Sequence, residues 1–278
     1  MRSPSFLSDL TSPQIMGVLN VTPDSFSDGG RFVSSGKLLL DDALKEAEAM
    51  VTAGASIIDV GGESTRPGAA KVTQEEEMAR VLPVVEALAS RIDAVISVDT
   101  STPALMRAAV DVGAGLLNDV RALSKPGALE VAAGANVPVC LMHMQGQPST
   151  MQAQPHYDDV VADVRAYLLE RAQAAIAAGV KKENIILDPG FGFGKTDEHN
   201  VKLLQSLPSL CATGYPVLAG LSRKSMIGRL LGREPQDRLA GSLALALIAA
   251  QNGAKIIRVH DVAETHDVLS LLTTIQKL

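Results

Sequence analysis

Long apolar runs and blocks of basic residues are both missing from this sequence of 278 residues. The longest apolar run, residues 243–250, is far too short to span a bilayer. Acidic residues outnumber lysine and arginine, which leaves a formal net charge of -6. This balance argues against nucleic acid and against an anionic membrane surface. We therefore expect neither nucleic acid nor a membrane as a partner.

Cysteine is also scarce, and its two positions indicate a cellular compartment. Cys140 and Cys211 both lie in apolar stretches, which favours free, buried thiols over a disulfide. Residues 1–13 alternate Ser, Pro and Asp with single apolar residues, so they offer no apolar core for a signal peptide. We expect this N-terminal segment to be flexible and the protein to be soluble and cytoplasmic.

Residues 185–196 read Ile-Ile-Leu-Asp-Pro-Gly-Phe-Gly-Phe-Gly-Lys-Thr, a short aliphatic run followed by a glycine-rich loop. The run ends on Asp188, and Pro189 prevents the strand from continuing. A phosphate-binding P-loop would need glycine at Pro189, and a dinucleotide-binding motif would need glycine at Lys195. The pattern therefore predicts a buried strand that delivers one carboxylate to the rim of a sheet or barrel.

Eight apolar runs alternate with stretches of helical spacing along the chain. The apolar runs cover residues 15–19, 56–60, 94–98, 115–117, 137–142, 184–187, 216–221 and 254–259. The helical stretches cover residues 37–53, 73–90, 102–112, 126–133, 158–178, 197–206, 236–252 and 263–277, the second opening with a capping box of Thr73 and Glu76. Apolar strands joined by helices are typical of a parallel sheet buried on both faces. The sequence predicts one (β/α)8 TIM barrel domain over residues 1–278, with an open doubly wound sheet as the alternative.

Polar residues fall at or just past the end of every predicted strand. They are Asn20, Asp59, Asp99, Asn118, His143, Asp188, Lys224 and Arg258. One such residue would be explained by helix capping, but eight strands behaving alike are not. Barrel enzymes assemble their active sites from the carboxyl ends of several strands. We therefore expect an active site here.

The residue types indicate a ligand with two chemically different ends. The carboxylates and amide of Asp99, Asn118 and Asp188 suit the N–H and NH2 edge of a planar amino-heterocycle. Arg258, and His260 when protonated, suit an anion such as a phosphate ester. A ligand with a heteroaromatic end and a phosphorylated end satisfies both groups.

Other interpretations of the same residues remain open. Lys224 could form a Schiff base, although it lies in a turn past Ser222 and not within a strand. His143 and His260 could be core histidines whose nitrogens bind backbone carbonyls. A divalent metal could be held by His143, Asp59, Asp99 and Asp188, although no short-range ligand signature occurs. Solvated charges are expected at Arg121, Arg165 and Arg171.

Eight motifs in order resemble those of the dihydropteroate synthase family, the pterin-binding barrels of folate synthesis. The first two are Met-Gly-Val-Leu-Asn-Val-Thr-Pro-Asp-Ser-Phe-Ser-Asp-Gly-Gly (16–30) and Gly-Gly-Glu-Ser-Thr-Arg-Pro-Gly (61–68). The others are Ser-Val-Asp-Thr (97–100), Asn-Asp-Val (118–120), Met-His (142–143), residues 188–196, Ser-Arg-Lys-Ser (222–225) and Arg-Val-His-Asp (258–261). The resemblance covers the chain from about residue 14 to its end.

The resemblance implies condensation of 6-hydroxymethyl-7,8-dihydropterin diphosphate with p-aminobenzoate and release of pyrophosphate. It also implies a Mg²⁺ ion, a homodimer and a target of sulfonamides. No nucleophilic side chain is needed, because the protein would stabilise the departing anion and position the arylamine. The glycine-rich segments 20–36 and 61–71 would then close over the substrates.

Roles carried over from the resemblance fall into four groups. The pterin pocket would be Asp99, Asn118, Asp188 and Lys224, and Asn20 would bind Mg²⁺. The diphosphate side would be Thr65, Arg258 and His260. The p-aminobenzoate side would be Thr65, Pro67, Phe193 and Ser222, with Phe26. Asp28 and Arg66 lie on the two closing loops, and they join Lys224, Arg258 and His260 as the candidate catalytic residues.

Three rival functions are weighed against this one. Methyl transfer from methyltetrahydrofolate to a corrinoid has no anion to hold. A non-catalytic pterin-binding paralogue, serving as a partner subunit, would be expected to have lost loop or anion-binding residues. A phosphosugar barrel lacks the two long loop motifs. For the dimer, the apolar stripe Leu243, Leu247 and Ala250 is a candidate surface, although we interpret it as core in preference to interface.

Overall fold

The computed structural model describes residues 7, 10–22, 36–63, 72–146, 151–152 and 154–278. In this part of the chain, eight parallel strands form one sheet with the order β6-β5-β4-β3-β2-β1-β8-β7. The strands are β1 (Gln14–Asn20), β2 (Ile57–Gly61), β3 (Val95–Asp99), β4 (Leu116–Asp119), β5 (Val139–Met142), β6 (Ile185–Asp188), β7 (Leu218–Ala219) and β8 (Ile256–Val259).

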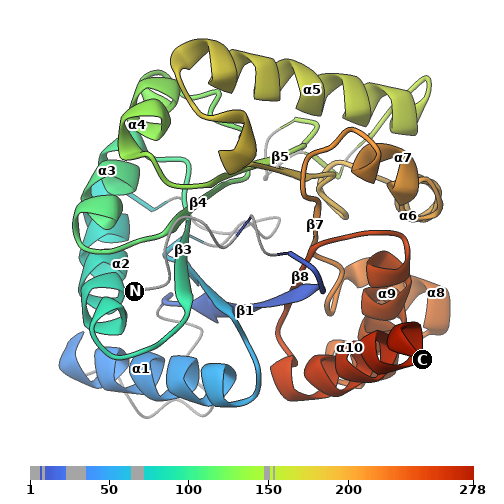
Figure 1. Ribbon diagram of the computed structural model, residues 1–278, viewed down its shortest axis with the longest axis horizontal. Helices are drawn as coiled ribbons and strands as arrows, with labels where there is room; N and C mark the ends of the chain where they lie inside the picture. Colours follow the sequence, from blue (N-terminus) through green and yellow to red (C-terminus); the bar gives the residue numbers. More distant parts are fainter. Residues whose placement is uncertain (1–6, 8–9, 23–35, 64–71, 147–150, 153) are drawn as a thin grey trace.

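The two ends of the sheet meet, so the sheet is a barrel (Figure 1). A parallel bridge joins Leu187 of β6 to Val217, immediately before β7. The Leu187 N–H also donates to the Pro216 carbonyl at 2.9 Å. The predicted (β/α)8 barrel is confirmed, and the open doubly wound sheet is wrong.

Helices surround the barrel on the outside, as Figure 1 shows. They are α1 (Gly36–Thr52), α2 (Gln74–Ala89), α3 (Pro103–Asp111), α4 (Ala128–Ala135), α5 (Val160–Ala178), α6 (Asp197–Gln205), α7 (Leu207–Cys211), α8 (Ser225–Leu231), α9 (Leu239–Gln251) and α10 (Val262–Lys277). The sequence does not predict α7, and it gives no bounds for α8, the helix that the turn at residues 222–224 opens, since helices of five and seven residues are too short to show a helical period. No helix of the described residues is long and apolar enough to cross a bilayer.

The helix ends follow ordinary local rules. The predicted capping box of α2 is present, because the Glu76 N–H donates to Thr73 Oγ1 at 3.2 Å and the Thr73 N–H donates to Glu76 Oε2 at 2.9 Å. Helix α5 begins after Asp159, whose carboxylate accepts from two backbone N–H groups. It ends at Gly179, which has a φ of +110°. Local sequence therefore fixes where these helices begin and end.

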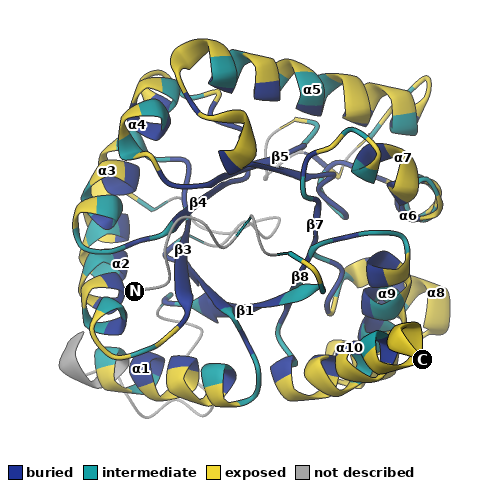
Figure 2. Ribbon diagram, viewed as in Figure 1, coloured by how far each residue is buried: buried dark blue, intermediate teal, exposed yellow. Residues whose placement is uncertain are grey.

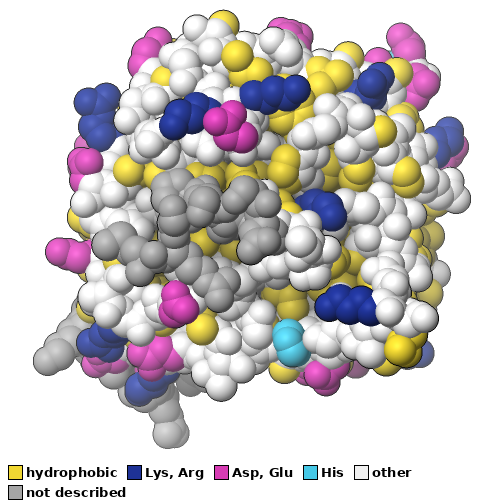
Figure 3. Space-filling view, in the orientation of Figure 1, with side chains coloured by type: hydrophobic (Ala, Val, Ile, Leu, Met, Phe, Trp, Pro, Cys, Tyr) yellow, Lys and Arg dark blue, Asp and Glu magenta, His cyan; other side chains and the backbone are white. Residues whose placement is uncertain are grey.

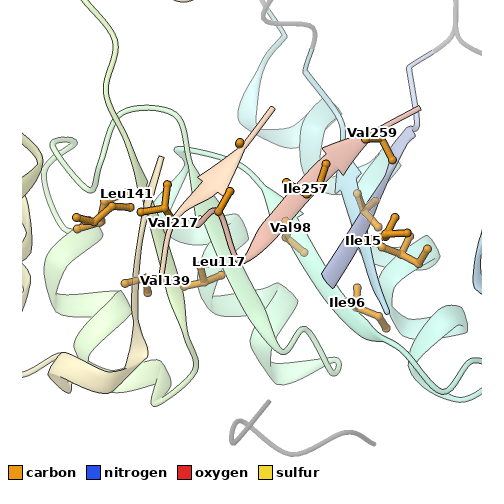
Figure 4. Close-up of a cluster of buried hydrophobic side chains, with 14 of the residues drawn as sticks. Ile15, Ile96, Val98, Leu117, Val139, Leu141, Val217, Ile257 and Val259 are labelled. Carbon is orange, nitrogen blue, oxygen red and sulfur yellow. The ribbon is translucent and has the colours of Figure 1, made fainter. Parts of the chain in front are cut away.

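Both faces of each strand are buried, as expected for a parallel barrel (Figure 2). One cluster takes a single residue from each strand: Met16, Ile57, Val95, Leu116, Cys140, Ile186, Leu218 and Ile256, with Leu7 packed against it. The alternate residues pack in the larger cluster with the helices, and Figure 4 labels nine of them. Cys140 is buried and Cys211 is half-buried, and both are free thiols, as the sequence predicts.

Charges on the outer surface are mixed. Figure 3 shows Lys and Arg side chains interspersed with Asp and Glu side chains around the edge of one face. Several are paired: Lys202 lies 2.9 Å from Glu198 on α6, and Arg229 donates to both oxygens of Asp197. The described part of this face is therefore mixed in sign.

The loop after β6 requires glycine at one position. Gly190 has a φ of +66°, and a Cβ built there would lie 1.9 Å from the His143 carbonyl oxygen. Gly190→Ala is expected to reduce the free energy of unfolding by roughly 3 kcal/mol or more, from backbone strain and this clash. The matched control is Gly134→Ala, since nothing lies within 4 Å of a Cβ at that exposed position in α4. That change should add about 0.5–1 kcal/mol. Urea unfolding of both variants tests this, and equal stabilities would contradict it.

Candidate active site

Polar residues form the inner layers of the barrel directly above its apolar floor. In a strand, residues two apart face the same side. Two residues beyond the floor cluster of Met16, Ile57, Val95, Leu116, Cys140, Ile186, Leu218 and Ile256, the inward positions are Val18, Asp59, Ser97, Asn118, Met142, Asp188, Gly220 and Arg258. Two residues further on, Asn20 and Asp99 have the same facing, and Ser222 and His260, just past the ends of β7 and β8, contact each other at the same rim. The predicted site residues thus share the carboxyl-end mouth of the barrel.

Asp59 is the centre of the hydrogen-bond network in the first polar layer. It is fully buried, and its carboxylate accepts from Ser97 Oγ at 2.6 Å and from Asn118 Nδ2 at 3.1 Å. Arg258 Nε donates to the same carboxylate at 2.7 Å. Arg258 Nη2 donates to Asp99 Oδ2 at 3.1 Å. One guanidinium therefore joins two carboxylates from β2 and β3 and is held in a fixed orientation.

Two carboxylates, the buried Asp188 and the partly buried Asp99, have pKa values shifted toward neutrality. Burial raises the pKa of Asp99 to about 7, the charge of Asp59 adds to this, and Arg258 opposes it. Burial also raises the pKa of Asp188 to about 6, although the Gly190 N–H donates to its Oδ1 at 2.7 Å and favours the charged form. Such groups can accept hydrogen bonds from a ligand or exchange a proton with it near neutral pH.

Lys224 brings a cation to these carboxylates from outside the strands. It precedes α8, and burial lowers its pKa to about 8, helped by Arg258 and opposed by Asp188 and Asp99. Its ammonium lies 4.3 Å from the centre of the Phe193 ring, a cation–π contact. The Lys224 ammonium therefore lies between the carboxylate cluster and the aromatic ring of the loop after β6.

The surroundings of His260 disfavour its protonated form, on which its predicted role as a cation for an anion depends. Burial lowers its pKa to about 4, and the positive charge of Arg258 adds to the effect. Its Nδ1 lies 3.1 Å from Ser222 Oγ, and its backbone N–H donates to the same oxygen at 3.2 Å. The adjacent Asp261 accepts two hydrogen bonds from Arg223, which has a φ of +56°. The two motifs at 222–225 and 258–261 are thus joined side by side.

The alternative metal site built on His143 is wrong. His143 Nδ1 lies 2.9 Å from Lys195 Nζ, and its ring packs edge-on against Tyr167 at 5.0 Å. Burial lowers the pKa of His143 to about 3, and Lys195 adds to this. Asp59 and Asp99 are already paired with Arg258, and no group of three His, Cys, Asp or Glu among the described residues could hold a metal ion. His143 is buried, as the core alternative predicts, but its Nδ1 faces the Lys195 ammonium and not the backbone carbonyl that this alternative expects.

Asn20 offers a different kind of metal ligand, a single amide oxygen. Its Oδ1 would lie 3.7 Å from a Cβ built on Gly61, so the glycine keeps the space beside that oxygen free of a side chain. Mg²⁺ is usually held by one or two protein oxygens together with water and substrate phosphates. The donor chemistry of Asn20 fits that role.

Five of the predicted site residues lie outside the described residues: Phe26, Asp28, Thr65, Arg66 and Pro67. One prediction about a surface charge is wrong. Arg171 is not a solvated charge, because its Nε and Nη2 donate to the carbonyls of Ala122 and Leu123 at 2.9 and 3.0 Å. Both of these residues have positive φ. The sequence analysis also misses Ser97, which donates to Asp59. Ser97 lies two residues before Asp99 in the same strand, so its side chain faces the same side, and this spacing could have revealed it.

The chain matches known proteins over nearly its whole length. A family model described as pterin binding enzyme matches residues 16–260. The dihydropteroate synthase of Haemophilus influenzae is 58% identical over 263 residues, 95% of this chain and 94% of that protein. The Yersinia pestis dihydropteroate synthase structure with a sulfonamide drug has a TM-score of 0.91 at 52% identity, covering 97% of this chain and 96% of that one. The Xanthomonas albilineans enzyme in complex with 7,8-dihydropteroate has a TM-score of 0.87 at 49% identity, covering 97% and 95%.

The raised pKa of Asp188 makes this residue destabilising in the ligand-free protein at neutral pH. An acid whose pKa rises from 3.8 to about 6 on folding binds its proton more tightly when folded, so stability is lost as the pH rises through that range. Asp188→Asn is expected to raise the free energy of unfolding by on the order of 2 kcal/mol at pH 8 and to change it little at pH 4. Urea unfolding at the two pH values measures this.

The control for Asp188→Asn is Asp197→Asn. Arg229 lowers the pKa of Asp197 by a hydrogen bond, so its stabilisation is present above its unfolded pKa and is lost as the pH falls. This surface variant should be slightly less stable than the parent at pH 8. An Asp188→Asn effect of the same size at both pH values would contradict the analysis.

Proposed function

The chain belongs to the family of pterin-binding enzymes, and from this premise we propose that its barrel mouth performs the dihydropteroate synthase reaction. It condenses 6-hydroxymethyl-7,8-dihydropterin diphosphate with p-aminobenzoate to give 7,8-dihydropteroate and pyrophosphate. The observation that carries this conclusion is the meeting of the buried Asp188 and the partly buried Asp99 with the cations of Lys224 and Arg258 at the mouth of the barrel. Acids suit the pterin edge, and cations suit the diphosphate.

The pterin ring binds against the carboxylates. Asp188 and Asp99 are acceptors for ring N–H and NH2 groups, and their pKa values near neutrality let them follow the protonation state of the ring. Asn118 is held by its hydrogen bond to Asp59, so its amide has a fixed orientation. Lys224 completes the pocket and balances the acids. Water is excluded by burial, which strengthens each of these interactions.

The diphosphate leaves with its negative charge held by fixed donors. Arg258 is locked by Asp59 and Asp99 and does not need to reorganise as charge develops. His260 starts neutral, and an arriving anion raises its pKa, so it can donate to the phosphate or become a second cation. Mg²⁺, which Asn20 would hold with phosphate and water oxygens, supplies further positive charge to the leaving pyrophosphate.

The carbon–oxygen bond to the diphosphate breaks, and the arylamine nitrogen of p-aminobenzoate bonds to the same pterin carbon. The ring nitrogens delocalise positive charge at that carbon, and Asp99 and Asp188 stabilise it. The proton lost by the amine passes to solvent or to the released pyrophosphate. Phe193 and Ser222 are proposed to position the p-aminobenzoate, with Phe26, Thr65 and Pro67 from the two loops. Asp28 and Arg66 are proposed to close those loops over the substrates.

The active form is proposed to be a homodimer in the cytoplasm. The large apolar side chains exposed on neighbouring helices support a second copy: Leu230 and Leu231 on α8, Leu239 and Ile248 on α9, and Leu271 and Ile275 on α10. Figure 2 shows exposed positions along these helices. The stripe predicted from the sequence, Leu243, Leu247 and Ala250, is largely core, since Ala250 is buried and Leu247 packs against the core.

Light scattering at assay concentration measures the mass of the protein in solution, and the mass of a monomer would overturn the proposed dimer. The free thiols of Cys140 and Cys211 support the proposed location in a reducing compartment such as the cytoplasm.

The rival functions fit these observations less well. A methyl transferase acting on methyltetrahydrofolate would have no anion to place against Arg258 and Lys224. A non-catalytic paralogue would be expected to lose loop or anion-binding residues, whereas motifs 16–30 and 61–68 are both intact. Neither rival explains the locked guanidinium.

The proposed function is tested by pyrophosphate release from the purified protein. Pterin diphosphate, Mg²⁺ and p-aminobenzoate are supplied together and then omitted one at a time. Release that needs the pterin substrate and Mg²⁺, with p-aminobenzoate converted to pteroate, is the expected result. Tight binding of the pterin without release would favour the non-catalytic paralogue.

Arg258→Lys is the sharpest variant for the diphosphate side. Lysine keeps the charge, but it cannot donate to Asp59 and Asp99 in the planar geometry that fixes the guanidinium. We expect kcat to fall roughly 10²–10³-fold, because a fixed donor to the developing charge is lost. Arg229→Lys is the matched control, since that arginine makes a similar two-bond pair with Asp197 on the surface. Parent-like turnover in Arg258→Lys would refute the role.

A further inference from the structure

The loop that follows β6 has its backbone carbonyls held by side chains from three places. Lys195 Nζ donates to the carbonyls of Gly190 and Phe193 at 2.9 and 3.0 Å. Tyr157 Oη donates to the Gly194 carbonyl at 2.8 Å, and Gln152 Nε2 donates to the Gly192 carbonyl. A loop with three positive-φ glycines is thereby fixed in one conformation.

Lys195 is the only charged member of this set, and it is buried. Its exposed fraction is 1%, an unusual environment for a lysine. Besides the two carbonyls, Nζ lies 2.9 Å from His143 Nδ1. An ammonium has three N–H donors, which these three close acceptors match, while the His143 carbonyl lies farther away at 3.5 Å. The low pKa of His143, about 3, keeps Nδ1 available as an acceptor.

The two residues whose carbonyls Lys195 binds, Gly190 and Phe193, also contact other side chains of the site. The Gly190 N–H donates to Asp188 Oδ1 at 2.7 Å, while the carbonyl of the same residue accepts from Lys195. Phe193 gives its carbonyl to Lys195 and its ring to the ammonium of Lys224. The buried Lys195 ammonium thus lies behind both the Asp188 carboxylate, which is proposed to bind the pterin, and the Phe193 ring.

We propose that Lys195 is a positioning residue for the reaction, fixing the Asp188 carboxylate and the Phe193 ring relative to each other and, when protonated, adding a positive charge behind Asp188. This inference rests on the proposed function. It assigns to the single lysine of the motif at 188–196 a role toward both substrates at once, through the residues that it positions. Losing the ammonium would let the Gly190 and Phe193 peptide groups rotate, and misplacement by about 1 Å can cost on the order of 10²-fold in rate.

The charge of Lys195 also acts on the protonation of Asp188. The charged groups that face Asp188 are Lys224, Arg258 and Lys195, and all three favour its ionised form. Burial lowers the pKa of Lys195 itself to about 7, with Asp188 opposing and Lys224 assisting the shift. Cys140, below Asp188 in the floor, stays a neutral thiol because burial raises its pKa. Removing the Lys195 charge therefore moves the pKa of Asp188 upward.

The test is the pH profile of kcat/KM for pterin diphosphate and the KM for p-aminobenzoate in Lys195→Met and Lys195→Gln. Methionine keeps the length and removes the charge and all three donors, while glutamine removes the charge but keeps two donors. We expect the acid limb of kcat/KM to move to higher pH in both, and the KM for p-aminobenzoate to rise about tenfold or more in Lys195→Met. Thermal unfolding reports whether each variant is folded.

Two controls separate positioning from stability. Tyr157→Phe removes one hydrogen bond to the same loop without removing a charge, so its acid limb should stay at the parent pH. Lys202→Met removes an exposed lysine from α6 and should match the parent throughout. Folded Lys195 variants with the parent profile and KM values would overturn the proposal, as would failure of both to fold. Loss of activity in the parent would instead refute the proposed function.

Discussion

The rest of the site depends on Asp59, a carboxylate fully buried beneath the mouth of the barrel. An isolated buried charge is very costly, so Asp59 must be paired, and its partner is Arg258. Removing one member of such a pair typically costs about 3–5 kcal/mol, because the other charge is left unpaired. The pair therefore holds the guanidinium in place before any substrate arrives. Asn118 and Ser97 satisfy the remaining positions of the carboxylate.

The sequence predicts most of the fold because the barrel repeats one simple unit. Eight apolar runs at regular intervals leave few arrangements other than a closed parallel sheet, and glycines such as Gly54 and Gly179 mark where helices end. Residue type and strand position also predict which side chains meet, since the carboxyl ends of parallel strands share one rim. Asp99 and Asp188 follow from this rule. The bounds of the short helices α7 and α8 escape prediction, because neither is long enough to show a helical period.

The pairings within the site could not be predicted, because they join residues far apart in the chain. Asp59 and Arg258 are 199 residues apart, and nothing local to either shows that they will bind each other. The neutral state of His260 depends on burial and on the nearby guanidinium, which only the folded structure provides. Lys195 shows the same limit: in sequence it ends a glycine-rich loop, and in the fold it is a buried ammonium surrounded by acceptors.

The closure of the barrel between β6 and β7 has a consequence for its internal motion. This seam consists of one bridge, and β7 is only two residues long, whereas β1 and β2 pair over five positions. With so few backbone hydrogen bonds, the seam is where the wall separates at the lowest free energy, and its amides should exchange with solvent ahead of those in β1 and β2. The segments that carry Asp188 and Ser222 leave from its two sides. Asp188 and Ser222, which are proposed to bind different substrates, therefore lie on opposite sides of the part of the barrel wall that opens most easily.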